Sequence, residues 1–334
     1  MRKAWTRVSA AVVLAALSCP APAQTTVEFK SITIVVGSSA GGGYDTYARV
    51  LARHIGRHIP GQPSVTVQNM PGASSLKAVQ YLDANVPKDG SVMAAFNPGL
   101  ITESLLNADK IRFKFSDVAW VGSITRDLRA CYAWAATGIK TWDDLKTYKR
   151  FNMGALAPGT SSFINAAVLK NMFGIAVHQV TGYAGSVEQR LAIERGELEG
   201  NCGSWSAMPQ DWVAHDKFNT LVRFSPTHPP DMPASVPFIE DLASTAEQRN
   251  LLTVLDASAE LGRPFIVAKA VPAERVSVLR NAFRATLEDS GFRKEAEAQS
   301  LPLDPVAGEE AAAVIERIYA APPELARKVK EVIE

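Results

Sequence analysis

A run of glycines lies between a strand-like segment and a helix-like segment. Residues 40–45 read Ala-Gly-Gly-Gly-Tyr-Asp. The first turn of a helix leaves backbone N–H groups without partners and carries partial positive charge. Because glycine lets a ligand approach the backbone closely, this run predicts an anion-binding turn that needs no basic side chain. Asp45 is a natural N-cap for the helix, and we favour capping over ligand contact as its role.

Two phosphate-binding motifs do not fit this run. A P-loop ends in Gly-Lys-Ser/Thr, whereas Tyr44, Asp45 and Thr46 stand at those positions. A dinucleotide-binding fingerprint requires a glycine where Thr46 stands. A turn that holds no ligand remains the alternative interpretation.

Two further turns join a strand to a helix and carry hydroxyl groups. Residues 157–162 read Ala-Pro-Gly-Thr-Ser-Ser, and residues 71–75 read Pro-Gly-Ala-Ser-Ser. Their hydroxyls can cap the helix or bind a carboxylate, and the sequence leaves both roles open. In open parallel sheets, ligands bind beyond the carboxyl ends of the strands. Two facing units of this kind would aim several helix N-termini into one cleft.

Catalytic and metal-binding patterns are weak in this sequence. Ser74 and Lys77 have the spacing of a serine-lysine nucleophile pair, but neither of its companion motifs accompanies them. His54 and His58 lie four residues apart without an evident third ligand. We therefore expect no enzyme activity, no metal site and no cofactor.

The pattern of elements predicts two α/β units. Apolar runs at 32–36, 65–67 and 92–95 alternate with helical patterns, and this order favours a parallel sheet covered on both faces. A second series repeats the outline with strands at 130–135, 151–155, 176–180 and 199–203. A proline-rich passage at 226–237 precedes a strand at 263–268, a helix from Pro272 and a helical final segment.

The first 23 residues have the features of a secretory signal peptide. Arg2, Lys3 and Arg7 precede an apolar run, and residues 21–23 form a small-x-small cleavage pattern. We expect the mature chain to begin at Gln24 and to be periplasmic. A buried N-terminal helix and a lipoprotein anchored at Cys19 remain alternatives.

Charge and cysteine content narrow the choice of function. The chain has 35 Lys and Arg residues and 34 Asp and Glu residues. It therefore lacks the excess of basic residues that is typical of nucleic-acid-binding proteins. Cys131 and Cys202 follow the predicted cleavage site, and export permits a disulfide between them. Two buried free thiols are the alternative.

An ordered set of motifs runs through nearly the whole mature chain. Residues 35–49 read Val-Val-Gly-Ser-Ser-Ala-Gly-Gly-Gly-Tyr-Asp-Thr-Tyr-Ala-Arg, and residues 67–73 read Val-Gln-Asn-Met-Pro-Gly-Ala. Further motifs lie at 88–90, 157–161, 182–185, 196–199 and 270–274. Together they resemble the Bug-type extracytoplasmic solute receptors (TctC-like) of tripartite tricarboxylate transporters.

The resemblance implies an α/β, two-lobed periplasmic-binding-protein fold, type II-like, with a ligand cleft between lobes. Lobe one would hold residues 29–124 and 225–334, and lobe two residues 125–224. The ligand would be a di- or tricarboxylate, an acidic amino acid or an aromatic acid, captured by hinge closure. The expected partners are membrane transporter subunits, and a monomer is expected. The alternative function is an exported module that presents its ligand to a sensor.

The resemblance also assigns ligand-binding positions. In lobe one they are Ser38, Ser39, Ala40, Gly43, Tyr44, Asp45, Ser74 and Asn97. In lobe two they are Thr160, Ser161, Ser162 and Tyr183. Tyr44 stands where the family usually has Thr or Ser, which predicts a reshaped pocket or stacking on an aromatic ligand. Phe163 replaces the usual histidine.

Overall fold

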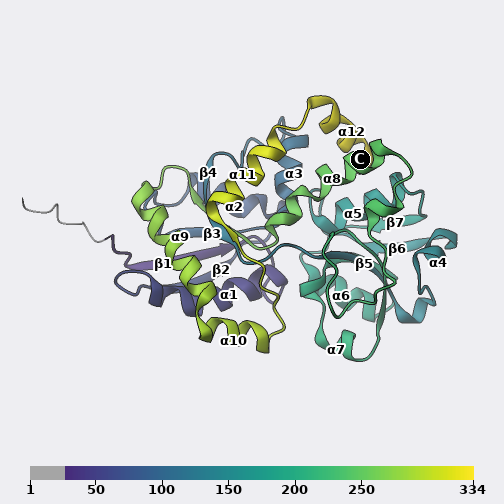
Figure 1. Ribbon diagram of the computed structural model, residues 1–334, viewed down its shortest axis with the longest axis horizontal. Helices are drawn as coiled ribbons and strands as arrows, with labels where there is room; N and C mark the ends of the chain where they lie inside the picture. The colour runs from purple at the N-terminus through teal and green to yellow at the C-terminus, as the bar shows by residue number, and fades with distance from the viewer. Residues whose placement is uncertain (1–26) are drawn as a thin grey trace, which may run out of the picture.

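The computed structural model describes residues 27–334, except for the side chain of residue 206. The predicted signal peptide therefore lies outside the described residues. The chain forms one six-stranded and one five-stranded sheet, which lie side by side with helices around each (Figure 1). We call the parts built on these sheets the first and second lobes. In the described part of the chain, no helix is long and apolar enough to cross a membrane.

The first sheet has the strand order β11-β4-β10-β3-β1-β2. Its strands are β1 (Ser31–Val36), β2 (Ser64–Asn69), β3 (Val92–Ala95), β4 (Val118–Ser123), β10 (Pro264–Ala268) and β11 (Val306–Ala307). The helices around it are α1 (Gly43–Ile55), α2 (Leu76–Ala84), α3 (Gly99–Leu106), α9 (Ala273–Glu288), α10 (Ser290–Ala298) and α11 (Gly308–Tyr319). β1 pairs in parallel with β2 and β3, so the carboxyl ends of these strands meet at one edge.

The second sheet has the strand order β7-β6-β8-β5-β9. Its strands are β5 (Arg129–Trp134), β6 (Phe151–Gly154), β7 (Val177–Val180), β8 (Gly200–Ser204) and β9 (Phe218–Arg223). The accompanying helices are α4 (Trp142–Thr147), α5 (Ser161–Asn171), α6 (Ser186–Glu194) and α7 (Gln210–Ala214). β6 runs parallel to β7 and β8, and their following turns again share one edge.

Short 3-10 helices join several of these elements. They are η1 (Gly56–His58), η2 (Ala73–Ser75), η3 (Ala135–Thr137), η4 (Trp205–Ala207), η5 (Ile239–Leu242) and η6 (Ala257–Leu261).

A disulfide joins Cys131 to Cys202. The two residues stand opposite each other on the antiparallel strands β5 and β8, which brings their side chains together. The disulfide that the sequence left open is therefore present, and the alternative of two free thiols is wrong.

The three strands that were predicted to lie in parallel, β1, β2 and β3, do so, but both sheets also contain antiparallel strands. β10 lies antiparallel between β3 and β4, and β5 lies antiparallel between β8 and β9. β5 is the first strand of the second sheet along the chain, and β10 joins the first sheet after the chain has returned from the second lobe. The hydrophobic period of a segment identifies it as a strand but does not show its direction relative to the neighbouring strands.

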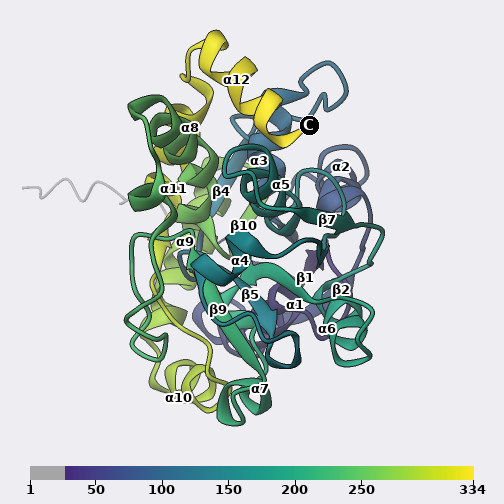
Figure 2. The same ribbon diagram turned by 90° about the vertical axis from the view of Figure 1, so that its right-hand side faces the viewer.

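Two late helices pack on the second lobe although the chain has already returned to the first. Leu252 and Leu255 of α8 (Ala246–Asp256) and Val329 and Ile333 of α12 (Pro323–Ile333) belong to the core that contains the second sheet. α12 lies beside α3, α5 and α8 (Figures 1 and 2). The predicted lobe boundaries remain a prediction, but the two lobes share these helices.

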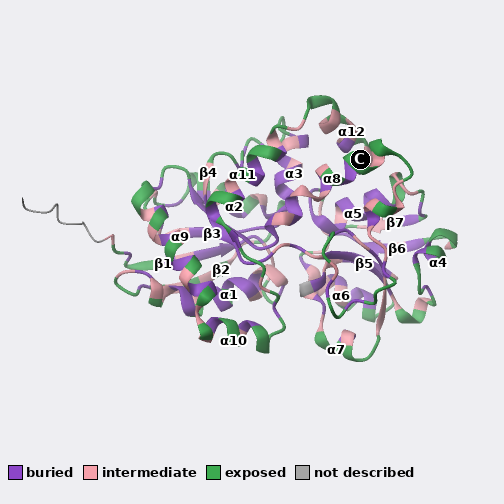
Figure 3. Cartoon of the chain, viewed as in Figure 1, coloured by how far each residue is buried: buried purple, intermediate pink, exposed green. Residues whose placement is uncertain are grey.

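Each lobe has its own buried interior (Figure 3). In α1, Tyr47, Val50, Leu51 and Ile55 form an apolar stripe, and all four are buried. This spacing places them on one helix face, which packs on the first sheet. The stripe fixes how α1 lies on the sheet and therefore where its N-terminus points.

Candidate ligand-binding site

A cavity of about 360 Å³ is lined by residues of both lobes. The first lobe contributes the turns that follow β1, β2 and β3, and the second lobe the turns that follow β6, β7 and β8. The N-termini of α1, α5 and α6 lie in these turns, and their first residues line the cavity. The predicted arrangement of converging helix N-termini is therefore present, with the partial positive charge that it brings.

The first-lobe wall is a set of turns tied together by one serine. Ser75 Oγ donates to the carbonyl oxygen of Gly37 at 3.0 Å and accepts from the backbone N–H of Asn97 at 3.1 Å. Ala73, Ser74 and Ser75 have φ of 44°, 56° and 79°, in the left-handed region that favours glycine. Such strain is held where the surrounding contacts over-determine the backbone, as the contacts of Ser75 do here.

The second-lobe wall contains the hydroxyls at the start of α5. Thr160 is the N-cap, and its Oγ1 accepts from the backbone N–H of Phe163 at 3.3 Å. Ser162 Oγ accepts from the N–H of Leu156 at 3.2 Å. Ser161 Oγ is buried without a hydrogen-bond partner among the described residues. Capping thus accounts for Thr160 but leaves Ser161 available to a ligand.

Several other buried polar atoms of the cavity wall lack partners within residues 27–334. They are Ser38 Oγ, Ser39 Oγ, Gln189 Nε2 and Asn201 Oδ1. Asn201 Nδ2 donates to Gln189 Oε1 at 3.0 Å, so this amide pair keeps one unused donor and one unused acceptor whichever way the amides are turned. An unsatisfied buried polar group costs about 1–3 kcal/mol, which a hydrogen-bonding ligand can offset.

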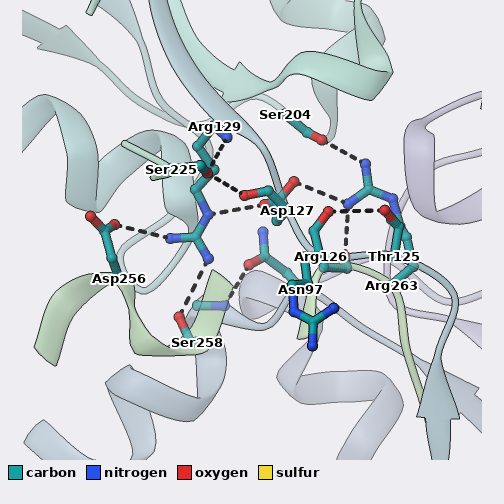
Figure 4. A network of polar contacts seen from close by, with 12 residues as sticks. Asn97, Thr125, Arg126, Asp127, Arg129, Ser204, Ser225, Asp256, Ser258 and Arg263 are labelled. Atoms are coloured by element: carbon teal, nitrogen blue, oxygen red, sulfur yellow. Dashed lines mark hydrogen bonds and ion pairs between the residues drawn. The ribbon is translucent and has the colours of Figure 1, made fainter. Parts of the chain in front are cut away.

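A charged network lies where the chain crosses between the lobes (Figure 4). Asp127 accepts from Arg129 Nε at 3.0 Å and pairs with Arg263 Nη1 at 3.4 Å. Burial favours the neutral carboxyl, but the guanidiniums of Arg263 and Arg129 outweigh it, so the pKa of Asp127 lies below its ordinary value. The carboxylate of Asp127 therefore lines the cavity with its negative charge balanced by two arginines.

Arg263 also lines the cavity and is held in place on several sides. Its Nη2 donates to Ser204 Oγ at 2.8 Å, and its Nη1 donates to the carbonyl oxygen of Gly262 at 2.7 Å. The guanidinium lies over the rings of Tyr44 and Tyr47, at 4.8 and 5.1 Å from their centroids. Burial is the largest effect that raises the pKa of Tyr44, so its hydroxyl stays neutral. Tyr44 thus stacks on Arg263 and reshapes this wall.

Arg190 is the remaining cation of the cavity wall. Its Nη1 donates to the carbonyl oxygen of Ala207 at 3.1 Å and to Ser186 Oγ at 3.4 Å. Its guanidinium forms no ion pair with any described residue. Burial lowers the pKa of Arg190, but an arginine remains charged in proteins.

Ten of the twelve predicted ligand-binding residues line the cavity. They are Ser38, Ser39, Gly43, Tyr44, Ser74, Asn97, Thr160, Ser161, Ser162 and Tyr183. Ala40 and Asp45 instead border a separate, more open hollow beside Arg49 and Gln299. That part of the predicted site is corrected by the structure.

The role predicted for Asp45 also changes. α1 begins at Gly43, and its N-cap is Gly42, so Asp45 lies inside the first turn. Its carboxylate accepts from the N–H of Gly41 at 2.8 Å, from Arg49 Nε at 2.9 Å and from Asn69 Nδ2 at 2.8 Å. Because the N-cap lies three residues earlier than expected, the Asp45 carboxylate instead holds the glycine turn through the N–H of Gly41.

Apart from Asn97, the charged and amide residues of the wall were not predicted from the sequence. They are Asp127, Gln189, Arg190, Asn201 and Arg263. Gln189 and Arg190 follow the predicted turn at 182–185 by one helical turn, which was an available signal. The other three lie in or beside strands whose place in the sheets the sequence did not indicate.

No family model and no curated protein sequence matches this chain. Solved structures do match over almost the whole length. The periplasmic binding protein BugD has a TM-score of 0.73 and 17% identity, covering 90% of this chain and 97% of BugD. A TctC solute binding protein from Polaromonas has a TM-score of 0.61 and 22% identity, with 91% and 97% covered. MatC from Rhodopseudomonas palustris with bound malate has a TM-score of 0.71 and 17% identity, with 91% and 99% covered. The predicted two-lobed fold is thereby confirmed.

Proposed function

We propose that this chain is a Bug-type periplasmic receptor. It would capture a small carboxylate ligand between its lobes and deliver it to a tripartite tricarboxylate-type transporter. The observation that carries the proposal is the convergence of three helix N-termini and the unpaired Arg190 on one cavity. Such a site favours an anion, and its unpartnered hydroxyls suit carboxylate oxygens. The similarity to BugD, to the TctC protein and to malate-bound MatC supports this assignment.

Closure of the lobes around the ligand is the expected mechanism. The lobes already touch across the cavity, since Ser74 Oγ donates to the carbonyl oxygen of Pro158 at 2.5 Å. A ligand that contacts both walls stabilises the closed form over the open form by its extra contacts. The transporter would then recognise the closed form.

The residues considered for catalysis have structural partners. Ser74 contacts Pro158 across the cavity. His54 Nε2 lies 2.6 Å from Glu295 Oε2, and His58 Nε2 lies 3.3 Å from Asp289 Oδ2, where α1 meets α10. These contacts support a binding role for the protein.

Ligand binding by the mature chain, residues 24–334, tests the proposal. The probes are malate, succinate, adipate, glutamate and benzoate, with glucose and acetamide as neutral controls. A carboxylate that binds specifically should raise the melting temperature by mass action. At a concentration of 100 times its Kd, it should add about 2.7 kcal/mol to the free energy of unfolding. Calorimetry should then give a one-to-one stoichiometry. A response to the neutral compounds with none to the acids would overturn the proposal.

A sensor partner in place of a transporter would use the same cavity. Genes that encode transporter subunits next to this one would support the transporter, and a neighbouring receptor kinase gene would support the sensor.

A further inference from the structure

The charges that line the cavity are unequally compensated. They are Asp127, Arg190 and Arg263. Asp127 and Arg263 pair with each other at 3.4 Å, and Arg129 joins them from behind. Arg190 alone among the three has no ion-pair partner in the described part of the chain. Glu194 and Glu188 of the same helix act on the Arg190 charge from beyond ion-pair distance, so a ligand carboxylate would be its first direct ion-pair partner.

The hydrogen bonds of Arg190 leave one edge of its guanidinium open. Both of its contacts use Nη1, which donates to Ala207 and to Ser186. Nε and Nη2 have no hydrogen-bond partner in residues 27–334. These two nitrogens form a planar fork that matches the two oxygens of a carboxylate. The Nη1 contacts fix the group in place, so the ligand need not order a mobile side chain.

The segment that anchors Arg190 also meets the first lobe. Ala207, which holds Nη1, lies against the start of α1 in the first lobe. A Cβ built at Gly43 would lie 3.4 Å from Ala207 Cβ and 3.2 Å from Arg263 Nη2. Glycine at position 43 thus lets the segment that carries the Arg190 anchor approach the first lobe. A ligand in this cavity would therefore lie between Arg190 and the start of α1.

We propose that Arg190 determines specificity by binding one carboxylate of the ligand through Nε and Nη2, which makes tight capture depend on negative charge at the α6 end of the cavity. This inference rests on the proposed function of carboxylate capture. It goes further by naming a residue outside the turns that match the resembling family. Arg263 has a different role, because its charge is already paired with Asp127 and its guanidinium already lies over the Tyr44 ring.

Three variants of the mature chain test the proposal by calorimetry. They are Arg190→Gln, Arg190→Lys and the control Arg195→Gln, which removes an exposed arginine at the end of the same helix. The probes are malate, succinate and adipate, together with the monoamide of whichever acid binds the wild type most tightly. Thermal unfolding without ligand shows that each variant is folded.

The expected result is a loss of affinity tied to charge. Arg190→Gln should weaken binding of the diacid by about 30-fold or more, the effect of removing one partner of a desolvated charge pair. Arg190→Lys should fall between this variant and the wild type, because it keeps the charge and loses the fork. Arg195→Gln should bind as the wild type does. The preference for the diacid over its monoamide should shrink in Arg190→Gln.

The other outcomes separate the two proposals. If the wild type binds a diacid and Arg190→Gln binds it equally well, the role of Arg190 is overturned while carboxylate capture stands. An equal loss for diacid and monoamide would also overturn it, because that result indicates a structural role. If the wild type binds none of the acids, the proposed function itself fails.

Discussion

Ser161 is buried at the start of α5 with its hydroxyl unpartnered among the described residues, next to two hydroxyls that do have partners. We expect Ser161→Ala to weaken ligand binding by about tenfold, the value of one ordinary hydrogen bond of roughly 1 kcal/mol or slightly more. The unliganded variant should be at least as stable as the wild type, because an unsatisfied hydroxyl is removed. Calorimetry and thermal unfolding measure the two effects.

Ser162→Ala is the matched control for this change. It removes the acceptor for the N–H of Leu156 and should lower the melting temperature. Unchanged affinity in Ser161→Ala would show that this hydroxyl does not contact the ligand.

Asp256 predicts a pH dependence of stability. Burial raises its pKa to about 8, while Arg129, at 3.9 Å from its carboxylate, opposes the shift and Glu240 and Asp127 add to it. The folded state then holds a proton that the unfolded state has lost, so stability falls as pH rises from about 4 towards about 8. Asp256→Asn removes this proton.

The expected result is that the plots of melting temperature against pH cross for the wild type and Asp256→Asn. The melting temperature of the wild type relative to Asp256→Asn should fall between pH 6 and pH 9. Asp109→Asn, at an exposed position, should follow the wild type at every pH. Parallel curves for Asp256→Asn and the wild type would exclude the protonated carboxyl.

Helix α8 follows the second crossing of the chain, yet it packs on the second core. Leu252 is fully buried there, so Leu252→Ala should cost about 2–5 kcal/mol of unfolding free energy. Hydrogen exchange should show the loss of protection mainly in the strands of the second sheet, β5 to β9. This result would assign α8 to the second lobe and revise the predicted boundary at 224/225.

Leu279→Ala is the reciprocal variant. Leu279 is equally buried in α9 and belongs to the first core. Its loss of protection should appear in β1, β2 and β3. If Leu252→Ala also loosened the first sheet before the second, α8 would belong to the first lobe.

The whole molecule depends on a close approach of the two lobes. A Cβ at Gly99 of α3 would lie 2.4 Å from the carbonyl oxygen of Gly159 and 3.2 Å from the N–H nitrogen of Ser161. Gly99→Ala should therefore disfavour the closed form and weaken ligand affinity by an order of magnitude or more. Small-angle scattering with ligand should show a larger radius of gyration than the wild type.

The stability of the unliganded variant is the control, because an open form does not contain this clash. Wild-type affinity together with a compact liganded form would show that closure does not bring Gly99 against Gly159.

Local patterns in the sequence were sufficient for much of this protein. The apolar stripe of α1, the strand at 92–95 and the helix start at Thr160–Ser161 follow from side-chain period and capping, which involve near neighbours. The turns that carry Ser38, Ser74 and Ser161 were placed correctly for the same reason. The predicted export of the chain made a disulfide possible. Only the structure shows that Cys131 and Cys202 stand opposite each other on paired strands and form one.

The tertiary structure decided which charged residues line the cavity. Asp127, Arg190 and Arg263 come from three distant segments, and only the closing of two lobes brings them to one cavity. Strand direction and the packing of α8 and α12 likewise depend on which faces are buried against each other, and no local period records that. The sequence therefore determined the turns that line the cavity, and long-range packing determined which arginines join them.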